Sequence, residues 1–476
     1  MQQEETNRKY GGVQFLSQMI YFSFGPIGGA FFAFLASITA AWLIDPGELG
    51  RVSLFTTAIT LTTLVSNLGL DRAYMREFAS SKNKEELLYN CLCVSLCTSI
   101  VASILIILLR QPIAGLLFDN SDYLSIAILA VILPIDIIGE YSIYTCRLYG
   151  NVKKYTIASI IQQLSYLIYI VGFYCLGIRG YRTIIFARAL SMATKSIVAV
   201  FLEREHYCFF GKLNKSIITS ALRYGVPYMP ALICSWVLNS MDKYALRIWS
   251  TYDEIGFYTS AFTIVSVLAI VRNAFNSFWT PLAYKWYDEG EDVSYFEKVG
   301  DYITVILIVL SSLIILLRNV IFKIYKPEYS HAANILPFLL FVISMETISY
   351  VVGCGINLKK KTIFNLVATA SACVINLIGN YILVPRMGGV GASISTGMSC
   401  MAYMLIKMFI SRTIWYKFSI IRYLINILLI TAMSACAIIF NSIFVDVCFA
   451  TFIIIYNLKS IYGIWAIMIR FVKKRK

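Results

Sequence analysis

The sequence is poor in charged side chains. Only 14% of its 476 residues are Asp, Glu, Lys or Arg, which is roughly half the usual share of a soluble domain. This shortage excludes a soluble globular protein, a nucleic-acid-binding protein and a disordered chain. The net charge of +15 is therefore better explained by the Lys and Arg excess of cytoplasmic loops than by an anionic macromolecular partner.

Patterns that bind metals or form disulfides are also scarce. The chain has two histidines, His206 and His331, and neither an HExxH motif nor a CxxC pair. Cys91, Cys93 and Cys97 lie close together, but within an apolar segment where cysteine packs as a small apolar side chain. We therefore expect no cofactor and no protein-bound metal.

Long apolar runs dominate what is present. The chain is 59% hydrophobic, with a mean hydropathy of +0.72, and about 20 apolar residues suffice to cross a bilayer as a helix. Fourteen runs qualify, at 13–43, 50–70, 88–109, 122–143, 156–177, 183–202, 220–240, 255–280, 300–322, 332–355, 362–384, 388–410, 420–441 and 444–466. The sequence predicts an all-α polytopic membrane protein with about fourteen transmembrane helices.

The distribution of Lys and Arg predicts the orientation. If the N-terminus is cytoplasmic, the inner segments carry 26 basic residues and the outer segments 10, as the positive-inside rule requires. The loop before Pro327 is the main exception, with three basic residues outside. Both termini are thus expected in the cytoplasm. No outer loop exceeds about 15 residues, which leaves no room for the catalytic domain of a membrane polymerase or transferase, so we do not expect an enzyme.

The two halves of the chain repeat each other. The segments 151–157 (NVKKYTI) and 357–363 (NLKKKTI) match at an offset of 206, as do Glu48 with Glu254 and Glu140 with Glu346, and 103–110 matches 311–318 at 208. The offset corresponds to six helices, an even number, so the repeats are parallel. We predict a lobe at 1–202, a cytoplasmic linker at 203–219, a second lobe at 220–412, and an additional helix pair with a basic tail at 413–476.

Polar residues inside the apolar runs suggest a hydrated pathway, because ionisable groups at membrane depth are costly. Asp136 and Glu140 are four residues apart on one helical face, and Arg188 and Lys195 are seven apart. The candidates for a substrate-binding cavity are Arg272, Arg188, Lys195, Asn273 and Asn276; the candidates for ion coupling are Asp136, Glu140 and Glu346.

Structural explanations for the same residues stay open at this point. Glu140 and Glu346 could pair with Arg147 and Lys359 near the inner interface. Arg223 and Lys195 could extend their long side chains to the inner surface.

Several motifs resemble those of the polysaccharide (O-antigen or repeat-unit) flippases of the multidrug/oligosaccharidyl-lipid/polysaccharide exporter superfamily. They are DPGELG at 45–50, NLGLDRAYMREFA at 67–79, YGVPYMP at 224–230, MDKYAL at 241–246, DEIGFYTSA at 253–261 and GGVGASISTG at 388–397. The resemblance covers essentially the whole chain. It implies two six-helix lobes around a central cavity, which we expect to be cationic, and the flipping of an undecaprenyl-diphosphate-linked oligosaccharide from the inner to the outer leaflet.

The expected partners follow from this resemblance. They are the lipid-linked oligosaccharide, membrane lipids, and polysaccharide polymerase or chain-length machinery. The expected location is the bacterial cytoplasmic membrane, and the expected product is O-antigen lipopolysaccharide, capsule or a related polymer. The alternative is a cation-coupled multidrug exporter of the same superfamily, which would have an acidic, aromatic cavity and lack the extra helix pair.

Overall fold

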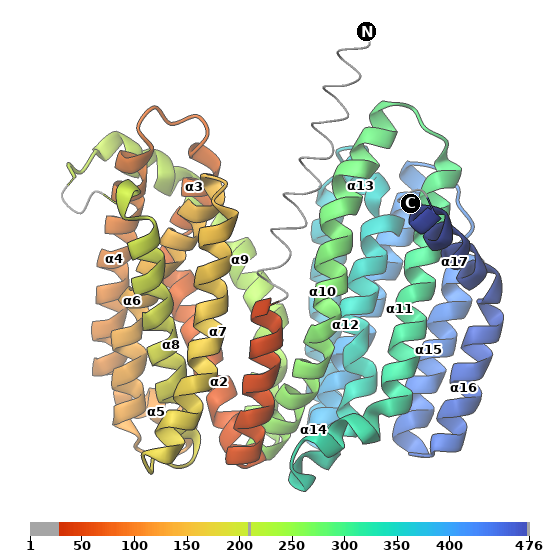
Figure 1. The fold of residues 1–476 in the computed structure, drawn as a ribbon, viewed down its shortest axis with the longest axis horizontal. Coiled ribbons are helices and arrows are strands. Elements are labelled where there is room, and N and C mark those ends of the chain that lie inside the picture. Colours follow the sequence, from red (N-terminus) through yellow and green to blue (C-terminus); the bar gives the residue numbers. More distant parts are fainter. Residues whose placement is uncertain (1–27, 208–210, 474–476) are drawn as a thin grey trace. The chain divides into compact units, whose positions relative to one another are not determined.

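The computed structural model describes residues 28–207 and 211–473 (Figure 1). These residues form helices joined by short connections, and no strand occurs among them. The prediction of an all-α chain is confirmed. The chain folds as two compact units, Met1–Lys243 and Tyr244–Lys476. The division between the two units falls inside α9 (Lys215–Trp249). The linker at 203–219, which the sequence repeat places between the two lobes, stays a prediction.

The described part of the first unit begins with a helix over Gly28–Leu43. It continues with α2 (Pro46–Asn67), α3 (Leu70–Glu77), α4 (Lys84–Leu108), α5 (Arg110–Phe118), α6 (Tyr123–Leu148), α7 (Val152–Cys175), α8 (Tyr181–Leu202), the 3₁₀ turn η1 (Arg204–His206) and the start of α9. α6 is the central helix of this unit and packs against α2, α4, α7 and α8.

The second unit repeats this plan. It contains α10 (Tyr252–Asp288), α11 (Val293–Ile321), η2 (Phe322–Ile324), η3 (Pro327–His331), α12 (Ala332–Val352), α13 (Cys354–Leu358), α14 (Ile363–Ile414), α15 (Ile421–Ile439), α16 (Ile443–Tyr456) and α17 (Leu458–Lys473). α12 is its central helix and packs against α10, α11, α14 and α15. α6 and α12 are the fourth helices of their respective repeats.

Short polar side chains start several of these helices. Asn83 caps α4 by accepting a hydrogen bond from the backbone N–H of Glu86 (3.1 Å), and Thr251 caps α10 by accepting one from that of Glu254 (3.3 Å). Such caps satisfy N–H groups that have no partner within the helix. At α4 and α10 a polar residue between apolar runs therefore marks where the helix begins.

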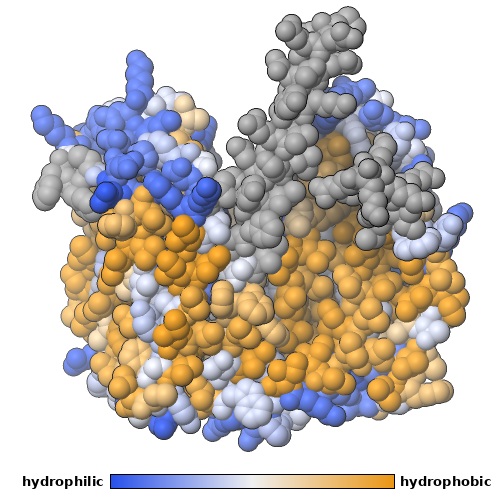
Figure 2. Space-filling view, viewed as in Figure 1, coloured by the Kyte–Doolittle hydropathy of each residue, from blue (hydrophilic) through white to orange (hydrophobic). Residues whose placement is uncertain are grey.

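The apolar runs correspond to membrane-length helices. In the described residues, ten helices are long and apolar enough to cross a membrane, or eleven with the bent pair α16 and α17. α14 contains two of the predicted runs, 362–384 and 388–410, separated by non-helical backbone at Gly388 (φ 54°). α9 contains the predicted run 220–240; part of the run 13–43 lies outside the described residues. Figure 2 shows a broad apolar belt on both units, as a lipid-facing surface requires.

Equivalent glutamates make equivalent contacts in the two repeats. The Glu48 carboxylate lies against Gly180 at the start of α8, where an added Cβ would be 2.5 Å from Oε1. Glu254 accepts a hydrogen bond from the backbone N–H of Gly389 (2.7 Å), where the second half of α14 begins. Each glutamate thus holds the start of the sixth helix of its repeat, which is an independent structural sign of the duplication.

The additional helices α15, α16 and α17 follow the second repeat and pack against α11. Towards one end of α11, the buried Arg318 pairs with the buried Asp446 of α16 and donates to the Ala437 carbonyl of α15 (3.0 Å). Towards the other end, Asp301 pairs with Arg422 of α15 (2.6 Å). Two ion pairs therefore hold the additional helices to the repeat.

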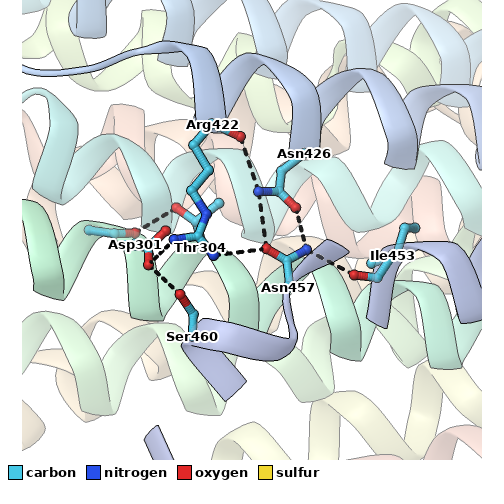
Figure 3. Close-up of polar contacts among 8 residues, drawn as sticks. Asp301, Thr304, Arg422, Asn426, Ile453, Asn457 and Ser460 are labelled. Carbon is cyan, nitrogen blue, oxygen red and sulfur yellow. Dashed lines mark hydrogen bonds and ion pairs between the residues drawn. The ribbon is translucent and has the colours of Figure 1, made fainter. Parts of the chain in front are cut away.

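A buried amide pair accompanies a bend in the last predicted span. Figure 3 shows Asn426 and Asn457 facing each other, and Asn457 donates to Asn426 Oδ1 (2.7 Å) and to the Ile453 carbonyl (3.0 Å). Ser460 of α17 donates to Asp301 (2.5 Å). Asn457 lies at the 61° break between α16 and α17, so the predicted run 444–466 forms a bent pair of helices.

Candidate functional site: a charged cavity at membrane depth

The first unit contains a cavity of about 440 Å³ beside its central helix. Its walls come from α2, α3, α6, α7, α8 and α9. Most of the lining residues have polar side chains, namely Thr56, Thr60, Thr63, Asn67, Asp71, Arg72, Asp136, Glu140, Tyr144, Gln162, Arg188 and Lys195. Since most of these residues lie on membrane-length helices, the cavity places charge where a bilayer would otherwise exclude it.

Lys195 joins the two predicted acidic residues at this cavity. Its Nζ lies 2.8 Å from Asp136 Oδ1 and 2.8 Å from Glu140 Oε1. The side chains of Lys195 and Asp136 are only 5% and 8% exposed, whereas that of Glu140 is 32% exposed. Thr63 donates a long hydrogen bond to Asp136 (3.5 Å). Two carboxylates share one ammonium group, so the trio carries a net charge of −1 when all three are ionised.

Glycine permits this close approach of α6 and α8. A Cβ at Gly139 would collide with Ser196 Oγ and would lie 3.1 Å from Lys195 Cε, so no side chain fits at that position. The alternative predictions for these residues are wrong. Arg147 donates to the Tyr155 hydroxyl (2.6 Å) instead of pairing with Glu140, and Lys195 is buried instead of reaching the surface.

Arg188 lies two turns before Lys195 on α8 and also lines the cavity. Its guanidinium sits over the Tyr166 ring, 5.3 Å from the centroid. Within the described residues no carboxylate is within ion-pair distance of it. Of the three predicted cavity cations, Lys195 and Arg272 have carboxylate partners and Arg188 has none in the described part of the chain.

The second unit pairs the predicted cation Arg272 with the predicted acid Glu346. Arg272 Nη1 lies 2.5 Å from Glu346 Oε2, and the Tyr350 hydroxyl donates to Glu346 Oε1 (2.9 Å). Arg272 Nε also donates to Asn273 Oδ1 (3.3 Å). The alternative pairing of Glu346 with Lys359 is wrong, because the Lys359 ammonium lies over the Tyr287 ring.

The remaining predicted residue, Asn276, stays within its own helix. It accepts a hydrogen bond from Thr280 Oγ1 (2.7 Å). The structure thus brings Asp136, Glu140, Arg188 and Lys195 to one cavity in the first unit, and Arg272, Asn273 and Glu346 to one polar cluster in the second. Their roles in transport stay predictions.

Sequence reasoning missed Lys407, which lies near the end of the predicted run 388–410, because it was counted among the basic residues of an inner segment. Its side chain is buried on α14, and Nζ contacts the Tyr403 hydroxyl (3.3 Å). It lines a small cavity of about 50 Å³ together with Thr280, Ser349, Tyr350 and Asn357. The sequence signal for a buried Lys407 was Tyr403, which lies four residues earlier on the same helical face and whose hydroxyl can contact the ammonium group.

Comparisons with known proteins agree with this architecture. The sequence model of the family described as "Polysaccharide biosynthesis protein" matches residues 15–285, more than half of the chain. The membrane protein MJ1068 of Methanocaldococcus jannaschii is 26% identical over 191 residues, which is 38% of this chain and 37% of that protein. The probable low-salt glycan biosynthesis flippase Agl15 of Haloferax volcanii is 20% identical over 184 residues, 38% and 39% of the two chains. The matched region thus spans less than two fifths of either relative.

Similar solved structures extend over most of the chain. The inward closed conformation of the lipid II flippase MurJ matches with a TM-score of 0.73 at 12% identity, covering 94% of this chain and 100% of that chain. An inward-facing multidrug resistance MATE family transporter of the MOP superfamily matches with a TM-score of 0.61 at 16% identity, covering 81% and 93%. At these identities the likeness shows a shared fold.

Proposed function

Because the chain belongs to the polysaccharide biosynthesis protein family, we propose that it is a flippase for a lipid-linked oligosaccharide. The substrate is an oligosaccharide repeat unit linked to a polyprenyl diphosphate, which in bacteria is undecaprenyl diphosphate. The protein moves it from the inner to the outer leaflet by alternating access. The product would enter O-antigen, capsule or a related surface polymer. The membrane is the bacterial cytoplasmic membrane with both chain termini inside, and polymerase or chain-length proteins would receive the product. The chain itself has a transport role and not an enzymatic one.

The cavity containing Arg188 is the observation that carries this proposal. A diphosphate sugar cannot cross hydrocarbon unaided, because an unpaired buried ion is very costly. The substrate's lipid tail can stay in the bilayer while the headgroup occupies a polar cavity. Arg188 offers a planar set of donors whose charge is compensated by no carboxylate within ion-pair distance in the described residues, which suits a diphosphate or an acidic sugar.

Arg272 becomes available to an anion only when Glu346 releases it. At 2.5 Å the carboxylate compensates the guanidinium, so an incoming diphosphate must compete with Glu346. Protonation of Glu346 would remove that competitor. We propose that this pair links protonation to substrate binding in the second unit, with Asn273 and Asn276 as neutral contacts.

The Asp136–Lys195–Glu140 trio suits a monovalent cation. Its net charge of −1 would be neutralised by a proton or a sodium ion, and Glu140 is its most exposed member. Transport need not be coupled to a proton or sodium gradient to be energetically favourable. An inside-negative potential favours outward movement of each negative charge by about 2.3 kcal/mol per 100 mV.

The test is a strain in which the chromosomal copy is replaced by variants. Deletion should cause a lipid-linked oligosaccharide to accumulate on the inner leaflet, and its identity defines the substrate. Arg188→Ala should abolish surface glycan at unchanged protein level, and Arg188→Lys should keep part of it. Arg110→Ala, an exposed arginine outside the cavity, is the matched control. Normal surface glycan in Arg188→Ala would contradict the role of Arg188.

A cation-coupled multidrug exporter is the second candidate. The first-unit cavity carries three acidic residues, Asp71, Asp136 and Glu140, against three basic ones, so it is charge-balanced and not cationic as a whole. The MATE-like fold is compatible with this function. Drug sensitivity of the deletion strain with normal surface glycan would favour this candidate over the flippase.

A further inference from the structure

A second polar cavity lies at one end of the first unit, outside the candidate site. It has a volume of about 590 Å³ and is formed by the end of α3, the start of α4 and the first turns of α9. Its lining includes Arg76, Glu77, Ser80, Ser220, Arg223 and Tyr224. The distribution of Lys and Arg predicts that this end is cytoplasmic. In Figure 2 hydrophilic residues gather above the apolar belt of this unit, at the end where Figure 1 labels α3.

Two arginines supply the chemistry of this cavity. Arg76 and Arg223 are both exposed, and no carboxylate in the described part of the chain is within ion-pair distance of either. The Arg76 guanidinium stacks over the Tyr224 ring, 4.3 Å from its centroid, which restricts its orientation. The acid of the lining, Glu77, accepts a hydrogen bond from Ser220 (3.0 Å). With one acid against two arginines, the cavity is cationic.

A backbone contact joins the two segments that carry these arginines. Gly69, just before α3, has φ +70°, and an added Cβ would collide with the Gly225 carbonyl oxygen. A Cβ at Gly225 would in turn lie 2.7 Å from the Leu68 carbonyl oxygen. Segments more than 150 residues apart in sequence therefore touch without intervening side chains. This contact holds the first turns of α9 against the segment that precedes α3.

α3 connects this cavity to the one at membrane depth. Arg72 lines the cavity at membrane depth, and Arg76 lines the cavity at the end of the unit. A spacing of four residues places both arginines on the same face of the helix. Arg72 is paired with Asp71 (3.3 Å). Arg223 and Arg76 therefore line the cavity at the end of the unit, and Arg72 and Arg188 line the cavity at membrane depth.

We propose that the Arg76–Arg223 cavity is a capture site for the diphosphate of the lipid-linked substrate, which it holds before transfer to the membrane-depth cavity. This inference rests on the proposed flippase function. Two guanidinium groups can each form bidentate bonds to phosphate oxygens. An anionic lipid headgroup offers the same oxygens, and the experiment separates these two sources.

The test measures binding of inorganic pyrophosphate to the purified full-length protein by calorimetry. Arg76→Gln/Arg223→Gln should weaken binding roughly tenfold or more, since it removes charge-assisted bonds from two groups. Arg110→Gln/Arg179→Gln is the matched control, because it removes the same charge from two exposed arginines outside the cavity, each of which lies over a tyrosine ring as Arg76 does. Unchanged binding in the Arg76/Arg223 variant, or an equal loss in the control, would overturn the proposal.

Two further arms identify the occupant and separate this proposal from the flippase function. In nanodiscs, pyrophosphate should bind equally well with phosphatidylcholine alone and with added phosphatidylglycerol. Loss of binding with phosphatidylglycerol would assign the cavity to membrane lipid and overturn the capture role. Arg188→Ala should keep the Arg76/Arg223-dependent binding while losing export. If deletion accumulates no lipid-linked oligosaccharide, the flippase function fails, whatever the pyrophosphate result.

Discussion

Replacement of Lys195 by methionine tests whether one ammonium group compensates two carboxylates. Methionine approximates the length of the lysine stem but has no charge. In Lys195→Met, Asp136 and Glu140 lose the nitrogen that lies 2.8 Å from an oxygen of each. Both carboxylates would then be left with their charges uncompensated beside the cavity.

The expected cost follows from this geometry. Two oxygens that each lie 2.8 Å from one nitrogen are at most about 5.6 Å apart, and at an effective dielectric constant near 20 two unit charges at that distance repel by about 3 kcal/mol. Removing one partner of a buried ion pair typically lowers the free energy of unfolding by about 3–5 kcal/mol. We expect Lys195→Met to lower the free energy of unfolding by an amount in this range, with one carboxylate taking up a proton.

The assay is unfolding of the purified protein in dodecyl maltoside micelles with increasing SDS, followed by circular dichroism. Asp136→Asn/Lys195→Met is the matched control. It retains the net charge of −1 that the trio carries in the wild type, so most of the stability should return. Comparing transport by this double variant with transport by Glu140→Gln/Lys195→Met shows which carboxylate couples ion binding to transport. Wild-type stability in Lys195→Met, or no recovery in the double variant, would refute the reasoning.

Three further predictions use the same unfolding assay. Gly388→Ala should destabilise the protein by at least about 1–2 kcal/mol, because Gly388 has φ +54° and its Cβ would lie 2.8 Å from the Glu254 carboxyl carbon. Burial raises the pKa of Asp122, but hydrogen bonds from three neighbours, Arg182 foremost, outweigh it and hold that pKa below its ordinary value. The stability from Asp122 should therefore be present above about pH 4 and be lost as the pH falls, so the difference between wild type and Asp122→Asn should narrow on acidification. Asp446→Asn should cost about 3–5 kcal/mol, because it leaves a buried arginine charge uncompensated.

The Gly388 and Asp446 predictions each have a matched control. Gly172→Ala adds a methyl group on a helix where nothing lies within 4 Å, and it should leave stability unchanged or slightly higher. For the ion pair, Arg318→Met/Asp446→Leu removes both charges and should be more stable than Asp446→Asn alone. Equal effects in variant and control would contradict the assigned contacts.

The sequence by itself determined the class of the fold. A bilayer leaves a long apolar run few options other than a helix, because each backbone group must find its hydrogen bond within the segment. The fourteen runs and the six-helix repeat followed from counting, and Glu48 and Glu254 do make equivalent contacts in the two repeats. The chain belongs to the polysaccharide biosynthesis protein family, whose model matches residues 15–285, and this agrees with the resemblance found in the sequence.

Tertiary structure alone decided which charges meet. Helical periodicity places Asp136 and Glu140 on one face of α6, but it does not say which neighbouring helix that face meets. The sequence suggested Arg147 as the structural partner of Glu140, whereas packing pairs Glu140 with Lys195 of α8. The pairing of Arg272 with Glu346 and the meeting of Arg76 with Arg223 were equally out of reach. A one-dimensional pattern fixes an angle around a single helix axis, whereas a binding site depends on how several axes are arranged.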